Sequence, residues 1–201
     1  MAHTTLTPAQ YLTGTLDAEA IARGIPSSYQ VKGMFFARLV DQLGADGFAR
    51  VEPELASPPR FGRFVPFSDY PQADYVRIST ATAQKLYPNV SLREGMRRLG
   101  RDDFNVLATS TIGKITLAAV GDARSVLLKA PFIYEKLSPG WRVTGEALDD
   151  STVRIEFTPV YGTWEYTLGQ LEGVVLNFGG TPTTTVSELP LKKLQFDVRH
   201  G

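Results

Sequence analysis

The sequence predicts an α+β domain in which N-terminal helices pack on a mainly antiparallel C-terminal sheet. Two observations support this prediction. Before Pro139 the apolar residues recur at helical spacing, and after it they alternate with polar residues as they do in strands. The helices come first and the strands last, without the βαβ alternation of a parallel sheet. With 201 residues, 43% of them hydrophobic, the chain can form one domain with an ordinary core.

The domain is expected to span residues 27–201, preceded by a polar N-terminal arm of residues 1–26. Apolar residues recur at helical spacing between Val31 and Leu43, and one of the two serines before them is a suitable N-cap. Gly44 is placed to end this helix, because glycine is the commonest residue just after a helix C-terminus.

Residues 45–70 are expected to form a long loop rich in proline and phenylalanine. The prolines exclude a central helix, and the stretch is too aromatic for a disordered linker. Two interpretations remain open. The aromatic side chains pack on the domain, or the loop is a lid over a pocket, since long ordered loops are often functional.

Further helices are expected before Pro139. The first, residues 73–87, is followed by Pro88. The second begins at Ser91, which forms a capping box with Glu94, and Gly100 is placed to end it.

The remaining helices lie closer to the sheet. Residues 102–121 predict a central buried helix, with two aspartates in the first turn that suit the helix dipole. Residues 122–140 predict another helix, kinked at Pro131.

The C-terminal third predicts strands. Residues 141–148 and 152–160 alternate as strands do, with a turn between them, and closing strands are expected at 183–189 and 191–200. Residues 167–178 are ambiguous from the residues alone, because their apolar spacing favours a helix and their glycines do not.

The residue inventory excludes several function classes. The chain has no cysteine and two histidines, His3 in the arm and His200 next to the end. Thiolate metal sites, a Ser-His-Asp triad and a haem with a proximal histidine are therefore not expected. We predict no cofactor and no metal site.

Charge and hydropathy indicate which partners and which cellular location to expect. Basic and acidic residues number 21 each, so the balance gives no reason to expect a nucleic acid partner. The N-terminus lacks the pattern of a secretory signal, and no apolar run is long enough to span a membrane. A cytoplasmic protein without a membrane span is expected.

The stretch from Ser91 to Arg101 contains four arginines within nine residues: Arg93, Arg97, Arg98 and Arg101. On a helix they share one side and the apolar residues take the other, which is typical of an amphipathic surface helix. Two interpretations remain open. The arginines form a solvated or salt-bridged face, with Glu172 as one candidate partner, or they bind an anion or an acidic protein surface.

A pocket is the second candidate site. Aromatic residues cluster near the predicted strand ends, which is compatible with an aromatic-lined cavity as well as with a core edge. We expect the pocket between the helix around Ile112–Ala119 and the sheet. The candidate lining residues are Phe35, Ile112, Ile115, Ala119, Trp141 and Trp164.

Several phrases carry a resemblance to known families. "YQVKGMFFARLV", "KLYPNVSLREGMRRLGR", "STIGK" and "LGQLEGVV" resemble the pattern of a large paralogous family of uncharacterised myxobacterial proteins of about this length. The likeness runs over nearly the whole chain. It implies that the arginine-rich stretch belongs to the shared body of the family.

A more distant resemblance is to the domain group of the vinyl-reductase, transport-particle and haem–nitric-oxide-binding types. "LGQLEGVV" and "VSELPLKKLQFDV" are similar to its C-terminal arrangement, which implies a helix over residues 167–178. The chain departs from the group's metal-binding patterns, since Leu191 and Leu194 stand near the cysteines of the vinyl-reductase type and the haem histidine is missing. An apolar pocket or a dimer surface is what the resemblance still implies.

These observations predict a non-enzymatic cytoplasmic sensory or adaptor module, homodimeric, with a small hydrophobic ligand as its candidate signal. The alternative is a protein-interaction module that binds an acidic partner through the arginine-rich helix. The third possibility is an enzyme of unrecognised type, in which carboxylates, lysine or tyrosine would have to provide acid–base catalysis.

Overall fold

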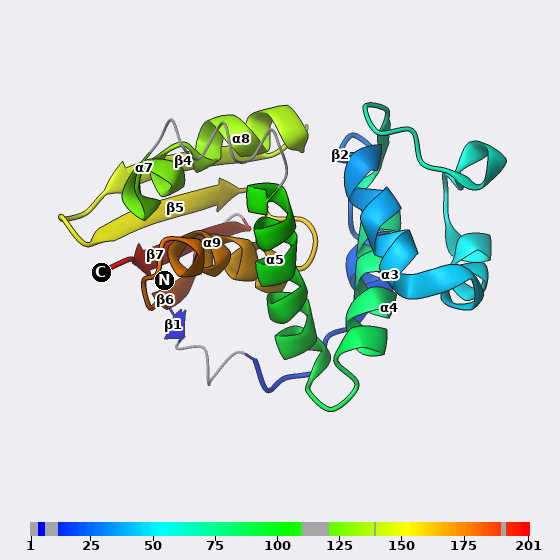
Figure 1. Ribbon diagram of the computed structural model, residues 1–201, viewed down its shortest axis with the longest axis horizontal. Coiled ribbons are helices and arrows are strands. Elements are labelled where there is room, and N and C mark those ends of the chain that lie inside the picture. The colour runs from blue at the N-terminus through cyan, green and yellow to red at the C-terminus, as the bar shows by residue number, and fades with distance from the viewer. Residues whose placement is uncertain (1–3, 7–11, 110–120, 139, 190–191) are drawn as a thin grey trace.

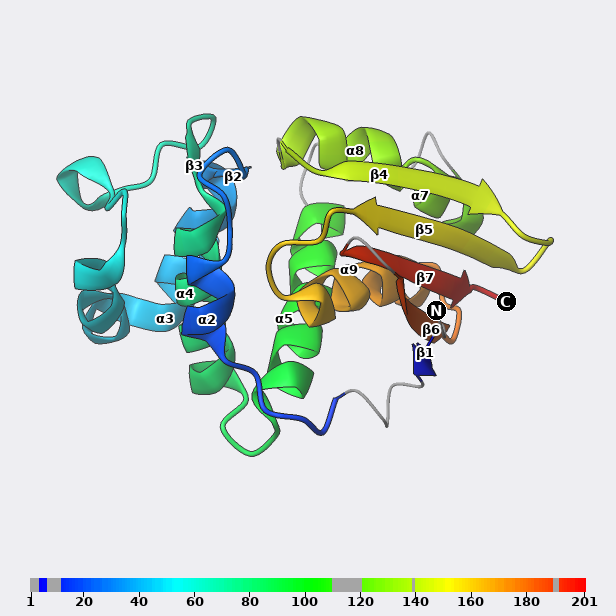
Figure 2. The same cartoon turned by 180° about the vertical axis from the view of Figure 1, so that it is seen from behind.

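The chain folds into two lobes with one long helix between them (Figures 1 and 2). The computed structural model describes residues 4–6, 12–109, 121–138, 140–189 and 192–201. Helices make up most of the N-terminal part, and an antiparallel sheet lies toward the C-terminus, so the predicted α+β class is confirmed. Among the described residues, no helix is long and apolar enough to cross a bilayer.

The larger sheet has five strands in the order β1-β6-β7-β5-β4, with every neighbouring pair antiparallel. The predicted alternation is clear in the inner strand β5, where Val153, Ile155 and Phe157 are buried and their neighbours are not. The strands are β1 (Thr4–Leu6), β4 (Arg142–Ala147), β5 (Thr152–Thr158), β6 (Thr183–Leu189) and β7 (Lys193–Arg199).

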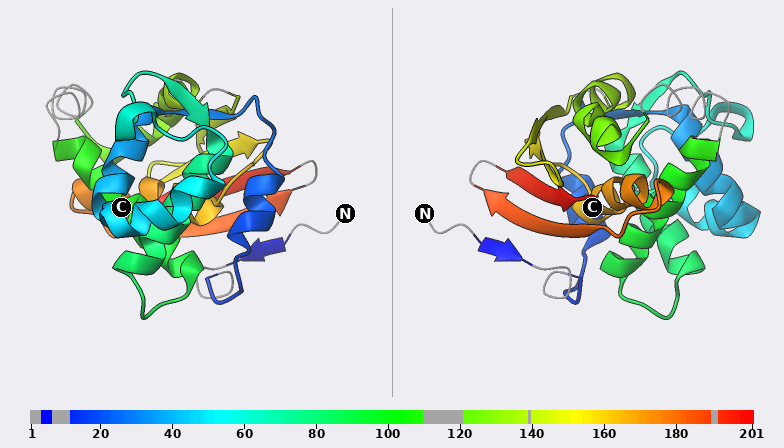
Figure 3. Two further views of the ribbon diagram at one scale, coloured as in Figure 1. Left: turned by 90° about the vertical axis from the view of Figure 1, so that its right-hand side faces the viewer. Right: turned by 60° about the vertical axis from the view of Figure 1, so that its left-hand side comes forward.

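The N-terminal arm contributes to both lobes. Strand β1 forms an edge of the five-stranded sheet by pairing with β6. Helix α2 (Ala18–Arg23) lies in the other lobe, where Glu19 accepts two hydrogen bonds of 3.0 Å from Arg77 of helix α4 (Gln72–Leu86). The views of Figure 3 show the arm leading from the sheet edge to this helix.

The first long helix begins later than predicted. Residues Gln30–Lys32 form strand β2, which pairs with β3 (Asp69–Pro71), so helix α3 (Gly33–Val51) begins after the predicted serine cap. The helix is interrupted at Gly44, where the sequence predicted its end. Gly44 has a φ of 72° and a ψ of 166°, which are not helical, and a second helical segment follows it as far as Val51.

The stretch predicted as a loop over residues 45–70 is helical as far as Val51, and it then contains two short 3₁₀ turns at Glu52–Glu54 and Arg60–Gly62. Two of its apolar side chains, Leu55 and Phe64, are buried against the domain, whereas Val65 and Phe67 are exposed. The buried Asp74 carboxylate of α4 accepts hydrogen bonds of 2.9 and 2.8 Å from the backbone N–H groups of residues 56 and 57. These contacts support the packing interpretation.

The arginine-rich stretch is the first half of helix α5 (Leu92–Thr109). The backbone N–H of Glu94 donates to Ser91 Oγ over 3.2 Å, as expected of the capping box. The predicted end at Gly100 is wrong, because the helix continues through it. A Cβ at this position would lie 2.1 Å from the carbonyl oxygen of Tyr166, so glycine here permits close packing against helix α9 (Trp164–Asn177).

The ambiguous segment at 167–178 is helical, as the resemblance implied. Between α5 and the sheet, the predicted kink at Pro131 is a break near Lys129 that separates α7 (Ala123–Leu128) from α8 (Ala130–Leu137). The separate buried helix expected over residues 102–121 does not begin at Asp102, because residues 102–109 are the second half of α5 and its two aspartates lie in mid-helix. Residues 110–120 lie outside the described residues.

Two apolar clusters correspond to the two lobes. One joins α7, α9 and the inner face of the sheet, and the other joins α3, α4 and the loop that follows α3. Helix α5 belongs to both, because Met96 and Leu99 are buried in the second cluster and Phe104 in the first.

Candidate functional site

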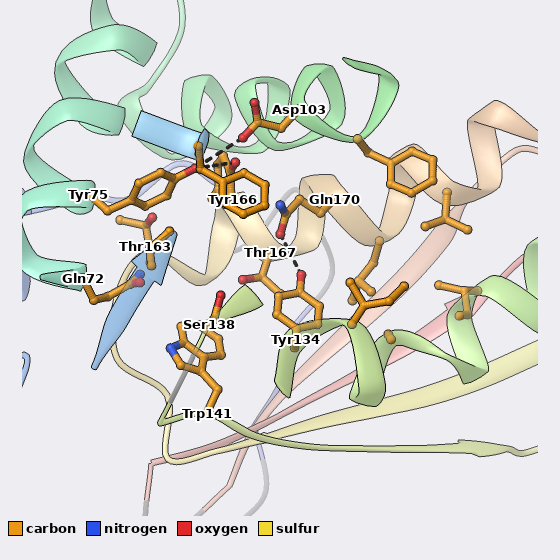
Figure 4. Close-up of a pocket in the computed structure, with 18 of the residues that line it drawn as sticks. Gln72, Tyr75, Asp103, Tyr134, Ser138, Trp141, Thr163, Tyr166, Thr167 and Gln170 are labelled. Atoms are coloured by element: carbon orange, nitrogen blue, oxygen red, sulfur yellow. Dashed lines mark hydrogen bonds between the residues drawn. The ribbon is translucent and has the colours of Figure 1, made fainter. Parts of the chain in front are cut away.

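A cavity of about 120 Å³ lies where the two lobes meet (Figure 4). Helices α4 and α5 border it on one side and α8 and α9 on the other. The described residues that line it are Val31, Phe35, Gln72, Tyr75, Asp103, Phe104, Val126, Leu127, Ala130, Ile133, Tyr134, Ser138, Trp141, Thr163, Tyr166, Thr167, Gln170, Leu171 and Val174. None of these residues belongs to the five-stranded sheet, so the predicted position between helices and sheet is replaced by one between helices.

Apolar side chains dominate one part of this lining. Leu127 and Ala130 come from α7 and α8, and Leu171 and Val174 face them from α9. An apolar cavity of about 150 Å³ lined by such residues binds benzene. The cavity is therefore suited to a ligand with a small hydrocarbon part.

Phenol side chains and one carboxyl group form a polar wall. The hydroxyl oxygen of Tyr75 lies 2.6 Å from that of Tyr166 and 3.3 Å from Asp103 Oδ2. Burial raises the pKa of Asp103 to about 8, but the guanidinium group of Arg38 contacts the same carboxyl group and favours its charged form. Because cation and carboxylate are in direct contact, we interpret them as an ion pair.

Tyr134 lies in the cavity wall opposite this group. Its hydroxyl donates a hydrogen bond of 2.7 Å to Gln170 Oε1. Burial raises the pKa of Tyr134 above its usual range, and it has the same effect on Tyr75. Both phenols are therefore neutral hydrogen-bonding groups at physiological pH.

The predicted pocket residues have different outcomes. Phe35 and Trp141 line the cavity, whereas Trp164 packs against the sheet-side cluster and is not among the lining residues. The other three predicted residues, Ile112, Ile115 and Ala119, lie outside the described residues.

Sequence reasoning missed most of the cavity. In the sequence, Tyr75 and Tyr134 occupy positions that are unremarkable for amphipathic helices. They line the same cavity only because α4 and α8 both approach α9. The lid interpretation finds no support here, because none of the described lining residues falls within 45–70.

The arginine-rich half of α5 faces α9, not an open groove. Arg97 donates two hydrogen bonds of 2.7 Å to the two carboxylate oxygens of Glu172, and Arg101 Nε donates to Glu172 Oε2 over 2.9 Å. Glu172 is fully buried. The structure therefore supports the interpretation of the arginines as a salt-bridged face, with Glu172 as the partner that the sequence suggested.

The two other arginines differ in exposure. Arg93 contacts the buried Glu165 at the start of α9. Arg98 is the most exposed of the four, donates to Glu94 over 2.8 Å and lies over the ring of Tyr87. Three of the four guanidinium groups thus already bind carboxylates of α9, which leaves little capacity for an external anion.

This difference predicts opposite results for two neighbouring charge reversals. Arg97→Glu would place a second carboxylate beside buried Glu172, and we expect it to lower the free energy of unfolding by at least about 3 kcal/mol. Arg98→Glu disrupts an exposed i,i+4 ion pair and should change the free energy of unfolding by under about 1 kcal/mol. Urea denaturation of both variants measures this. Equal stability of the two would contradict the assignment of Arg97 to the buried pair.

Comparisons with known proteins agree with this architecture. The sequence profile of a family described as "Protein of unknown function (DUF2378)" matches residues 25–200. No curated protein sequence matches the chain.

Solved structures of H-NOX proteins are similar in fold. An Fe(II) unliganded H-NOX mutant from K. algicida has a TM-score of 0.66 at 12% identity, covering 85% of this chain and 96% of its own. An Fe(II) H-NOX protein from S. oneidensis has a TM-score of 0.65 at 16% identity, with coverages of 85% and 96%. A third structure, which concerns haem redox potential and porphyrin distortion, has a TM-score of 0.63 at 16% identity, covering 84% and 99%.

The residues of this cavity do not fit a haem group. The described lining residues include no histidine, cysteine or methionine to bind the iron, and the hydroxyls of Tyr75, Tyr134 and Tyr166 already take part in hydrogen bonds within the protein. Among the described residues, no group of three or more histidine, aspartate or glutamate side chains could hold a metal ion. This chain shares the fold of the H-NOX structures, and the described lining of its cavity offers no ligand for haem iron.

Proposed function

The chain belongs to the DUF2378 family and has an H-NOX fold, and on this basis we propose that it is a non-enzymatic sensory or adaptor module. Its signal is a small, largely apolar molecule that binds in the cavity between the two lobes. The observation that carries this proposal is the cavity itself, about 120 Å³ in volume and lined by helices of both lobes.

The arrangement of the lining supports a sensory role. Phe35 and Tyr75 belong to the N-terminal lobe, while Tyr134 and Leu171 belong to the other. A ligand that contacts both lobes stabilises the arrangement in which the cavity is closed. It can shift the equilibrium between the closed and open arrangements only by the difference between its binding free energies for the two.

The composition of the lining supports binding over catalysis. The one described carboxyl group in it, Asp103, is paired with Arg38, and the described lining residues include no lysine or histidine to act as a general base. The cytoplasmic location and the homodimer predicted from the sequence stay predictions.

Binding of benzene tests the proposal by isothermal titration calorimetry. We expect saturable binding at one site, and at ten times the Kd the ligand should add about 1.4 kcal/mol to the free energy of unfolding. Ala130→Leu, which fills the cavity from α8, should abolish binding. Ala37→Leu, a partly exposed position of α3 outside the lining, is the matched control and should bind benzene normally.

Absence of binding of both benzene and its hydroxylated analogue phenol to the folded wild-type protein would overturn this function. Binding that survives Ala130→Leu would place the ligand elsewhere in the molecule.

A further inference from the structure

The cavity wall contains two buried polar atoms without a hydrogen-bond partner in the described part of the chain. They are Gln72 Oε1, on a residue that is 7% exposed, and Trp141 Nε1. A buried polar group without a partner is unfavourable, and nearly all such groups in folded proteins are paired. Both atoms belong to residues that line the cavity, so a molecule in the cavity is able to supply the missing partners.

These two residues mark one end of the cavity. Figure 4 shows Gln72, Ser138 and Trp141 gathered at the same end, while side chains that consist only of carbon occupy the opposite end. The cavity therefore has a polar end and an apolar end. This division suits an amphiphile better than a pure hydrocarbon.

The charges around the cavity favour an uncharged ligand. No lysine, arginine or histidine is among the described lining residues, so a negatively charged group would be buried without a counter-ion. The carboxyl group of Asp103 is in contact with Arg38 and is not free to bind a cationic ligand.

The hydroxyl groups of the three tyrosines of the wall are already engaged. The Tyr134 hydroxyl donates a hydrogen bond to Gln170, and the hydroxyls of Tyr75 and Tyr166 are hydrogen-bonded to each other. The partners still required are an acceptor for the indole N–H of Trp141 and a donor for the amide oxygen of Gln72. A hydroxyl group supplies both, and it suits the amide of Gln72 in either orientation.

We propose that the ligand is a small neutral amphiphile whose hydroxyl group accepts a hydrogen bond from Trp141 Nε1 and donates one to Gln72 Oε1. Its hydrocarbon part lies against the apolar side chains of α7, α8 and α9. The volume limits that part to about the size of a benzene ring. This inference rests on the proposed function and adds the chemical class of the ligand to it.

Phenol and benzene are the matched probes, because they differ only by the hydroxyl group and phenol is neutral at pH 7. Calorimetric titration of the wild-type protein should give a Kd for phenol about tenfold lower than for benzene. Gln72→Met removes the amide with little change of shape, whereas Trp141→Phe removes the indole N–H together with one of the two rings. In each variant the ratio of the phenol affinity to the benzene affinity should fall about fivefold, and in Gln72→Met the benzene affinity itself should stay as in the wild type.

The outcomes separate the two proposals. Equal affinities for benzene and phenol in the wild-type protein would overturn the hydroxyl assignment and leave the ligand-binding function in place. A preference for phenol that persists unchanged in both variants would also overturn it, because the head group would then lie elsewhere. Failure of both probes to bind would instead overturn the proposed function. A thermal melt of each variant verifies that it is folded.

Discussion

Gly169→Ala is expected to destabilise the protein by about 3 kcal/mol, although alanine is the better helix former. A Cβ at position 169 would lie 1.9 Å from the carbonyl oxygen of Arg97 and 3.0 Å from the backbone nitrogen of Arg101. Both atoms belong to the backbone of α5, so they can yield only if the two helices separate. Overpacking usually costs about 1–3 kcal/mol and occasionally more, and a clash with backbone on both sides belongs at the upper end, at about 4 kcal/mol. About 3 kcal/mol then remains after the gain of about 1 kcal/mol from helix propensity.

The matched control is Gly95→Ala on α5. A Cβ there would be 3.6 Å from its nearest neighbours on Ala83, which is an ordinary contact. Helix propensity should then prevail and stabilise the protein by about 0.5–1 kcal/mol. Thermal unfolding measures both, and the melting temperature of Gly169→Ala should fall by about 6–12 °C. A Gly169→Ala variant as stable as Gly95→Ala would refute the close crossing of α5 and α9.

Glu172→Gln is expected to lower the free energy of unfolding by about 3–5 kcal/mol. The carboxylate is buried and joins Arg97 and Arg101 of α5 to α9. The glutamine keeps the shape but removes the counter-ion of Arg101 and leaves Arg97 with only its 3.3 Å contact to Glu94. Breaking a buried pair in this way costs several kcal/mol. The variant therefore tests the electrostatic link between α5 and α9 without creating a cavity.

Urea denaturation of Glu172→Gln should be compared with Glu146→Gln. Glu146 is exposed on the edge strand β4, and its carboxylate is 3.8 Å from Arg154, so its removal should cost under about 1 kcal/mol. Replacement of all three charged residues, Glu172→Leu with Arg97→Met and Arg101→Met, should recover much of the loss, because no unpaired charge remains. A loss in Glu172→Gln no larger than in Glu146→Gln would contradict the buried pair.

The alternation of apolar residues was enough to predict the sheet strands, because a strand with one buried face needs period-2 spacing, as in Val153, Ile155 and Phe157. Helical spacing predicted α4, and the capping box predicted the start of α5. The local rule that glycine ends a helix was right at Gly44 and failed at Gly100. At Gly100 the reason for glycine is the approach of α9, a partner distant in sequence that no local pattern reveals.

The sequence by itself determined the α+β class and the succession of N-terminal helices and C-terminal sheet strands. Its residue types also make the common catalytic and metal sites implausible. Only the tertiary structure decided the role of the arginines, because Arg97 can bind Glu172 only after α5 and α9 have crossed. It also decided the cavity, which Phe35, Gln72, Trp141 and their neighbours form from separate elements. Secondary structure follows from short-range spacing along the chain, whereas a binding site depends on which distant segments fold side by side.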